Sequence, residues 1–578
     1  MSVQTDNTAA NASTREEDTT LRERIRQNPR PATIWFAGLA LLILLEFPKV
    51  IAGISAIGGV FAFVLDIALM VPDWIGGNVG GGAISFVVHD LVAIGLLFVA
   101  SIFVSGYILP WHVAERFDLD VTRRGSIYLD RAVATGILAA IAGILAFTPI
   151  GALLSNELSL WSSILDSLTE LPSLTDRELI SNQGYRSPDG SGWEGTFLGL
   201  EPKLAWMIRV GVVYAYAFAF LGWLWKGYNV FRDHYRAADW TPRDDTLRRF
   251  RNHTWGLFGL VVVIMFLVLA VWAPTISPVT AEANIYSTYE HEVTYLGDDG
   301  TLETVTHGVA NLDSQSRGNE NVGIWSYDDY GRWQPFGTTP HGQNLMTHLA
   351  YGAQTSLIIG VLAIGLGGLI AVLLSLVTAY YKGVADVITV IASDTIISIP
   401  LFLLVMMLSV IFNEGDHWLA EPMDGGLLLA LIFAFAYWPG LWRSIRGPSL
   451  QVSEEEWVDA AKSYGQTPLK TMRKHMAPYI AGYIMIYASL IVGGVIIATS
   501  ALSFLGLGIN PPTPEWGRLI ADGRQYVSGP SWHIATVSGI MIVLVVTAFN
   551  ALGDGIRDAI DPEADVGGDG GAAAGGGG

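Results

Sequence analysis

The chain has 578 residues, of which 51% are hydrophobic and only 15% are charged, and it contains no cysteine. A soluble protein of this size would carry a clearly larger charged fraction. The formal net charge of −20 excludes nucleic acid as a partner, because that interaction needs clustered Lys and Arg. The lack of cysteine excludes disulfides, thiolate metal sites and cysteine nucleophiles.

The charged residues are strongly biased towards acids, with 53 Asp and Glu against 33 Lys and Arg. Dense surface carboxylates remain well solvated when salt screens their mutual repulsion. From composition we therefore expect a halophile, that is, a protein adapted to a high-salt environment.

Apolar runs of about 20 residues, the length that a helix needs to cross a bilayer, predict an all-α polytopic membrane protein. The first run, 33–71, is interrupted by Glu46, Pro48 and Lys49. Either 50–71 crosses alone and 33–47 is interfacial or re-entrant, or both cross. Clearer spans are predicted at 84–109, 132–154, 204–225, 256–276, 355–377, 387–412, 427–442, 479–502 and 534–552. We expect about ten transmembrane helices, or eleven if the N-terminus is outside.

Loop charge predicts the orientation, because Lys and Arg concentrate in cytoplasmic loops. Segments 226–254 and 443–478 are rich in Lys and Arg and are expected inside. Segment 277–333 is acidic, with only Arg317 and Arg332 as basic residues, and is expected outside. Counting spans then predicts a multi-pass protein of the cell membrane with cytoplasmic N- and C-termini.

Composition also divides the chain into four parts. Residues 1–32 form a polar cytoplasmic tail, and 33–245 form an N-terminal membrane extension of about four helices without a recognisable motif. Residues 246–562 hold six spans, and 563–578 form a Gly/Ala-rich tail that we expect to be disordered. Within the external loop 277–345, two alternating runs flank Asp299-Gly300 and predict a small β-hairpin.

The loop 453–478 is predicted to form two short helices joined by a glycine bend. Ser453 and Glu456 have the spacing of a capping box, and Gly465 is expected to end the first helix. Thr467-Pro468 would begin the second helix, and Pro478 would close it. The first helix carries an apolar stripe at helical spacing, made of Trp457, Ala460, Ala461 and Tyr464. Such a stripe either rests on lipid headgroups or contacts a protein partner.

Two residues inside the predicted span 387–412 are candidates for pathway lining or gating. Asp394 is either such a residue or a hydrogen-bonded carboxylate near the inner surface, since charge within the membrane is costly. Pro400 is expected to kink the helix. The external histidines 291, 307, 341 and 348 match no metal-ligand spacing, and we expect no metal site.

The 453–478 loop resembles that of binding-protein-dependent ABC importer permeases, through Asp459-Ala460-Ala461, Gly465 and Pro478. Asp459 stands where the family has glutamate, and His475 and Ala477 replace apolar residues. The segments 501–517, 521–524 and 549–562 are similar to the dipeptide/oligopeptide/nickel permease subgroup. Shorter matches upstream extend the resemblance to 247–562, although Thr339, Gln343 and Asn344 replace charged residues usual in that subgroup.

The resemblance implies a type I importer core of six helices and a coupling loop, within 443–478, that contacts a cytoplasmic ATPase. The residues expected to couple are Glu456, Trp457, Asp459, Ala460, Ala461, Tyr464, Gly465 and Pro478. The implied partners are ABC ATPase subunits, a second related permease, an extracellular solute-binding protein and membrane lipid. The implied cargo is a peptide or a similar small solute.

No phosphate-binding Gly-rich loop with a following Lys is present in the sequence. We therefore expect no cofactor on this chain and no enzyme activity of its own, with ATP and Mg²⁺ bound by the ATPase partners. An ion-coupled secondary transporter is the alternative. For residues 1–245, an assembly or signalling membrane module is a further alternative.

Overall fold

The computed structural model describes residues 20–53, 112–117, 122–147, 167–236, 240–318, 320–414 and 420–560, with a few scattered residues besides. The chain folds as two compact units. One consists of Gly38–Leu174, and the other combines Met1–Ala37 with Thr175–Gly578. Most of the expected tails, 1–19 and 561–578, lies outside the described residues.

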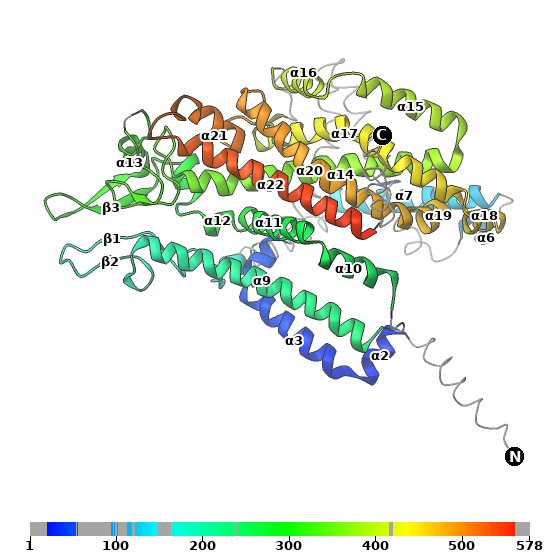
Figure 1. Cartoon of the computed structure of the whole chain (residues 1–578). Helices are drawn as coiled ribbons and strands as arrows, with labels where there is room; N and C mark the ends of the chain where they lie inside the picture. Colours follow the sequence, from blue (N-terminus) through cyan, green and yellow to red (C-terminus); the bar gives the residue numbers. More distant parts are fainter. Residues whose placement is uncertain are drawn as a thin grey trace, which may run out of the picture. The chain divides into compact units, whose positions relative to one another are not determined.

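Long apolar helices dominate the larger unit (Figure 1). Among the described residues, six helices are long and apolar enough to cross a membrane, or up to eight if each of two bent pairs counts as one span. The six are α9 (Pro202–His234), α11 (Thr254–Val271), α14 (Leu345–Tyr381), α17 (Gly426–Ser453), α20 (Ala477–Phe504) and α22 (His533–Ile560). The bent pairs are α2 (Leu21–Gln27) with α3 (Pro29–Leu45), and α15 (Gly383–Ile397) with α16 (Leu401–Glu414).

These helices confirm an all-α polytopic protein, with two differences from the predicted spans. The predicted span 387–412 is not one helix, because the chain bends by 82° between α15 and α16. Pro400 lies in this break, directly before α16, and its missing N–H cannot continue the hydrogen-bond ladder of α15. In addition, α17 continues past Pro439 and Pro448 to Ser453, well beyond the predicted end at 442. The total of ten spans stays a prediction, since most of 54–111 lies outside the described residues.

Small residues allow the helices of the larger unit to approach closely. A Cβ atom added at Gly259 of α11 would lie 2.5 Å from the Ala548 carbonyl oxygen of α22. Gly256 and Gly555 bring the same two helices together one turn away. Between α14 and α17, Gly367 faces the backbone of Ala434 in the same way. In a membrane, where lipid is as apolar as the helix surface, this close van der Waals packing stabilises helix pairs.

The loops at one end of the larger unit carry most of its β structure. Strands β3 (Glu292–Leu296) and β4 (Leu302–Thr306) pair antiparallel around Gly300, which confirms the predicted hairpin. A second hairpin, β1 (Tyr185–Arg186) and β2 (Trp193–Glu194), projects at the same end (Figure 1). A third pair joins β5 (Ser326–Tyr327) to β6 (Trp333–Gln334), and α13 (His307–Asp313) follows β4.

Arg332 holds these loops together from the inside. Its guanidinium donates to the Asp328 carboxylate at 2.6 Å and to the Asn311 side chain at 2.7 Å. It also donates to the Ala310 carbonyl oxygen on α13. Burial, reinforced by this cation, lowers the pKa of the neighbouring His307 to about 3, so the imidazole is neutral at physiological pH.

Helix α9 of the N-terminal extension is joined to the first span of the six-helix region by hydrogen bonds. Its side chains donate to carbonyl oxygens at the end of that span. Helix α11 ends at Val271 and continues as α12 (Ala273–Ile276), whose last carbonyl groups have no partner within the helix. Trp206 of α9 donates its indole N–H to the Ile276 oxygen at 2.8 Å, and Arg209 donates to the Ser277 oxygen at 3.0 Å. A cation at the carbonyl end of a helix is also favoured by the helix dipole.

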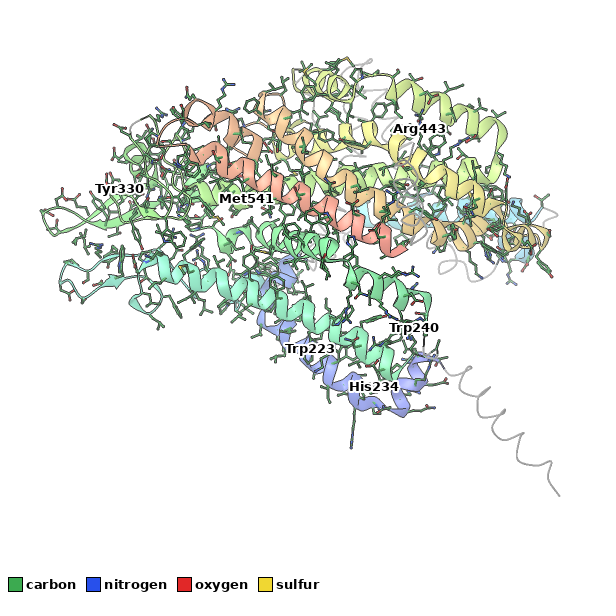
Figure 2. The ribbon with its side chains drawn as sticks, in the orientation of Figure 1. Trp223, His234, Trp240, Tyr330, Arg443 and Met541 are labelled. Atoms are coloured by element: carbon green, nitrogen blue, oxygen red, sulfur yellow. The ribbon has the colours of Figure 1, made fainter. Side chains whose placement is uncertain are left out.

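The N-terminal helix α3 packs on the same helix α9 through a reciprocal pair of tryptophans. The Trp35 indole donates to the Trp223 carbonyl oxygen, and the Trp223 indole donates to the Trp35 carbonyl oxygen, both at 3.0 Å (Figure 2). Gly227 makes room for this contact, because an added Cβ would lie 2.3 Å from the Trp35 ring.

In the unit Gly38–Leu174, the best-described element is α7 (Arg123–Phe147). Its Asp130 side chain accepts the Val113 backbone N–H at 2.8 Å, at the start of the short helix α6 (Val113–Arg116). The predicted span 132–154 overlaps α7, and the predicted span 84–109 lies largely outside the described residues.

Replacing Gly259 by alanine should destabilise the protein, because the added methyl group would push α11 away from α22. We expect a loss of about 1–3 kcal/mol, typical of an overpacked core, seen as a lower melting temperature in detergent. Gly211→Ala on α9 is the matched control, since its added Cβ has no neighbour within 4 Å. Equal melting temperatures for the two variants would contradict the close-packing argument.

Replacing Arg209 by methionine should destabilise the joint between α9 and α12. The Ile180 and Ser277 carbonyl oxygens would lose their donors inside the protein, at a cost of about 1–3 kcal/mol each. Arg209→Lys keeps the charge with a single nitrogen and should fall between methionine and wild type. Thermal unfolding of the three purified proteins checks this order, and a methionine variant as stable as wild type would refute it.

Candidate functional site

The loop between α17 and α20 contains two helical segments, as predicted, but with different ends. Helix α18 (Glu456–Ser463) is followed by α19 (Pro468–Thr471), which continues through the π-helical turn η5 (Met472–Met476) into α20. Residues Pro468–Phe504 therefore form one long helical run.

Two predicted caps of this loop are wrong. Ser453 is the last residue of α17, and its hydroxyl donates back to the Leu450 carbonyl oxygen at 2.7 Å, so it does not cap a new helix. Helix α18 begins at Glu456 instead. Pro478 does not close the second helix either: it lies in the first turn of α20, where a missing N–H costs little. The wider π-turn before it bonds the Ala477 N–H to the Met472 oxygen.

Gly465 ends α18 as the sequence predicts. Its φ is +75°, a left-handed conformation that strains any residue with a Cβ. The Gly465 N–H donates to the Lys462 oxygen at 2.9 Å, and the Gln466 N–H donates to the Ala461 oxygen at 3.1 Å. This pair of bonds is a Schellman motif, and it sets the angle between α18 and the following segment.

One face of the loop is packed into the protein. Val458 and Met476 are fully buried, and Ala461 and Met472 nearly so. Val458, Met472 and Met476 belong to a cluster with residues of α14, α17 and α20, among them Ile445 and Ile480. The loop is therefore seated on the ends of three long helices.

The opposite face is apolar and exposed. Tyr464 is 90% exposed, Leu469 is 69% exposed and Trp457 is 48% exposed. Ala460 is exposed beside them, whereas Ala461 is buried, so the predicted four-residue stripe is divided between the two faces. We call Trp457, Ala460, Tyr464 and Leu469 the exposed loop face. An apolar surface of this kind marks a site of contact with another molecule.

Charged side chains fix the loop to the end of α14. The Lys462 ammonium group contacts the Asp459 carboxylate at 3.1 Å and lies over the Tyr380 ring. Glu454 accepts from Lys382, the residue that follows α14, at 2.9 Å. Asp459 thus contributes to holding α18, while Glu456 is exposed in its first turn.

Asp394 pairs with Arg443 of α17, and Arg443 also donates to the Ser393 hydroxyl (Figure 2). About two turns away on α15, Asp386 forms a bidentate pair with Arg446. The sequence analysis did not single out Asp386. Two acids eight residues apart on one helix, and two arginines three residues apart on another, could have predicted a pair of ion pairs between the helices. The two pairs hold α15 against α17.

The segment 501–517, singled out by its motif, forms the turn between α20 and α21 (Trp516–Gly523). The buried Glu515 carboxylate accepts the N–H groups of Gly517 and Arg518 and the Ser500 hydroxyl. Burial raises the pKa of Glu515, and these donors oppose the shift. A Cβ added at Gly517 would lie 1.9 Å from the backbone carbonyl oxygen of Ser500, so only glycine fits at this position.

The polar residues Thr339, Gln343 and Asn344, which replace charged residues of the resembled subgroup, take part in hydrogen bonds before and at the start of α14. Asn344 caps α14 and donates to the Gln334 side chain at 2.6 Å, and the Gln343 side chain contacts His348 at 2.9 Å. Thr339 donates its N–H to the Gln343 oxygen. Across the described residues, no three His, Asp or Glu side chains are grouped to hold a metal ion.

Residues 338–566 match the family model of the binding-protein-dependent transport system inner membrane component. Residues 241–292 match the N-terminal TM domain of oligopeptide transport permease C. The chain is similar to the glutathione transport system permease protein GsiD of Escherichia coli O1:K1 / APEC, E. coli strain UTI89 / UPEC and Shigella boydii serotype 4 strain Sb227. Each is 29% identical over 324 residues, which cover 56% of this chain and 91% of the relative.

The two matches together lie within residues 241–566. The segment 241–292 contains α11, and the segment 338–566 contains the loop 453–478 and α22. The long apolar helices and these matches identify a multi-pass membrane protein of the transport class. Over residues 241–566, the chain therefore belongs with the permease subunits of binding-protein-dependent ABC importers of the peptide and oligopeptide type.

Proposed function

We propose that this chain translocates a peptide or a similar small solute that an external binding protein delivers, driven by separate ATPase subunits that act on the loop 453–478. The exposed loop face carries the proposal. Tyr464, Leu469 and Trp457 leave more apolar surface uncovered than a loop in water would keep without a partner. The partner would bind ATP and Mg²⁺, and this chain would bind neither.

The seating of the loop supports a mechanical role. Val458 and Met476 pack against helix ends of α14, α17 and α20, so a displacement of the exposed loop face would move these helices together. The pairs Asp386–Arg446 and Asp394–Arg443 would carry the movement on to α15. Alternating access then arises from rocking of the helices, and Asp394 and Pro400 act in positioning α15 and α16.

Orientation and further partners follow from charge and from the family. Lys and Arg in 226–254 and 443–478 favour an inside location for these loops and both termini, and the acidic segment 277–333 would then be outside. The external hairpins would then face the binding protein, and a second related permease would complete the pathway. The relatives are named for glutathione, a short peptide, which favours a small peptide as cargo.

Replacing Gly465 by valine should uncouple ATP hydrolysis from transport. The β-branched side chain penalises the left-handed conformation, so the Schellman motif opens and the exposed loop face shifts. In proteoliposomes with the complete transporter, we expect ATP-driven uptake to fall at least tenfold, while the complex still assembles in the membrane. Gly300→Val is the control, because its φ of +79° imposes the same strain in the external hairpin. Full uptake by Gly465→Val would sink the coupling assignment.

Replacing both Tyr464 and Leu469 by alanine should weaken capture of the ATPase subunits without unfolding this chain. The two side chains are exposed, so their loss removes apolar contact area with the partner only. Co-purification of the ATPase with tagged permease measures the effect, and we expect its yield to drop severalfold. Leu302→Ala, an exposed apolar residue of β4, serves as control. Unchanged ATPase yield for the double variant would count against the proposed interface.

A further inference from the structure

A separate pocket lies where α9 meets the amphipathic helix α10 (Pro242–Asn252), in the basic segment that precedes the first family span. Its volume is about 490 Å³. The lining combines guanidinium groups with indole rings and one leucine: Trp225, Arg232, Trp240, Asp244, Leu247, Arg248, Arg251 and Asn252. No step of the proposed transport mechanism uses this pocket.

The positive charge of the pocket is available to a ligand. Arg248 and Arg251 are one turn apart on α10, both are exposed, and neither has an ion-pair partner among the described residues. The one acid in the lining, Asp244, is already neutralised by Arg236, whose guanidinium bonds both of its oxygens at 2.9 and 3.0 Å. This pairing holds the pKa of Asp244 well below its usual range. The pocket therefore favours an anion.

The tryptophans of the pocket suit a position at the headgroup layer of a membrane. Trp225 and Trp240 are both about half exposed, and exposed tryptophans gather at membrane interfaces. From Trp225 to Arg232, helix α9 rises by about 10 Å, comparable to the headgroup layer of one leaflet. Trp240 lies in the connection between α9 and α10 (Figure 2). Apolar side chains and cations thus line the same pocket, as the tail and the head of an amphiphile require.

We propose that this pocket binds an anionic phospholipid, with its phosphate held by Arg248 and Arg251 and its acyl chains along Trp225 and Leu247. Arginine suits this role because its planar fork donates two hydrogen bonds to one phosphate. Arg232, from α9, closes the site on the other side, although it also contacts Asp233. The bound lipid would join α9 of the extension to α10, which leads into α11.

Mass spectrometry of the intact chain, released from nanodiscs containing phosphatidylglycerol or phosphatidylcholine, tests the proposal. Wild-type protein should retain phosphatidylglycerol in preference to phosphatidylcholine. Arg248→Gln and Arg251→Gln should each weaken retention of phosphatidylglycerol by about fivefold. Arg243→Gln is the matched control, since Arg243 is exposed on the same helix but does not line the pocket. It should retain phosphatidylglycerol like wild type.

Three results would overturn the proposal. The first is equal retention of the two lipids, and the second is an equal loss in Arg243→Gln, which would indicate a diffuse charge effect. The third is displacement of the lipid by millimolar glycerol 3-phosphate, which would make a soluble phosphate ester the ligand. Melting temperatures in lipid-free detergent should be unchanged and so show that the variants are folded, because Arg248 and Arg251 make no ion pair with any residue that the structure describes.

Discussion

Backbone groups in a membrane protein must find their hydrogen bonds inside the protein, and the end of the first family span shows how strongly this rule shapes the chain. Helix α12 ends with carbonyl groups that its own helix cannot satisfy, and the indole of Trp206 and the guanidinium of Arg209 supply the donors. Arg177 adds a further bond to the Pro278 oxygen. The part of the extension that carries α9 therefore belongs to the same compact unit as the permease helices, whereas Gly38–Leu174 form the other unit.

Charge is used differently in different layers of the same molecule. Between α15 and α17, acids and arginines pair, as in Asp386–Arg446, so that helices with few other polar groups keep a fixed register. In the loop 453–478, Lys462 pairs locally and leaves an apolar face uncovered. On α10, Arg248 and Arg251 have no ion-pair partner among the described residues. Paired charges thus mark internal joints, and uncovered apolar or cationic surfaces mark places for other molecules.

Features that depend on neighbouring residues could be predicted from the sequence, whereas features that depend on distant partners could not. The long apolar helices, the hairpin around Gly300 and the bend at Gly465 follow from hydropathy and from glycine's tolerance of positive φ. Ser453 was misassigned because its competing acceptor, the Leu450 oxygen, is available only if α17 continues that far. Ser277 lies 68 residues from its partner Arg209, and Arg446 lies 60 residues from its partner Asp386, and no local pattern records such a pairing.

The continuity of α19, η5 and α20 has a mechanical consequence. Residues Pro468–Phe504 make a rod of 37 residues, about 55 Å long at the rise of an α-helix. Leu469 sits at one tip, and the buried turn around Ser500 and Glu515 lies near the other. A stiff rod that tilts about its middle moves its tips by equal amounts in opposite directions. On the proposed function, a push on the loop would therefore move the far end of this helical run in the opposite direction.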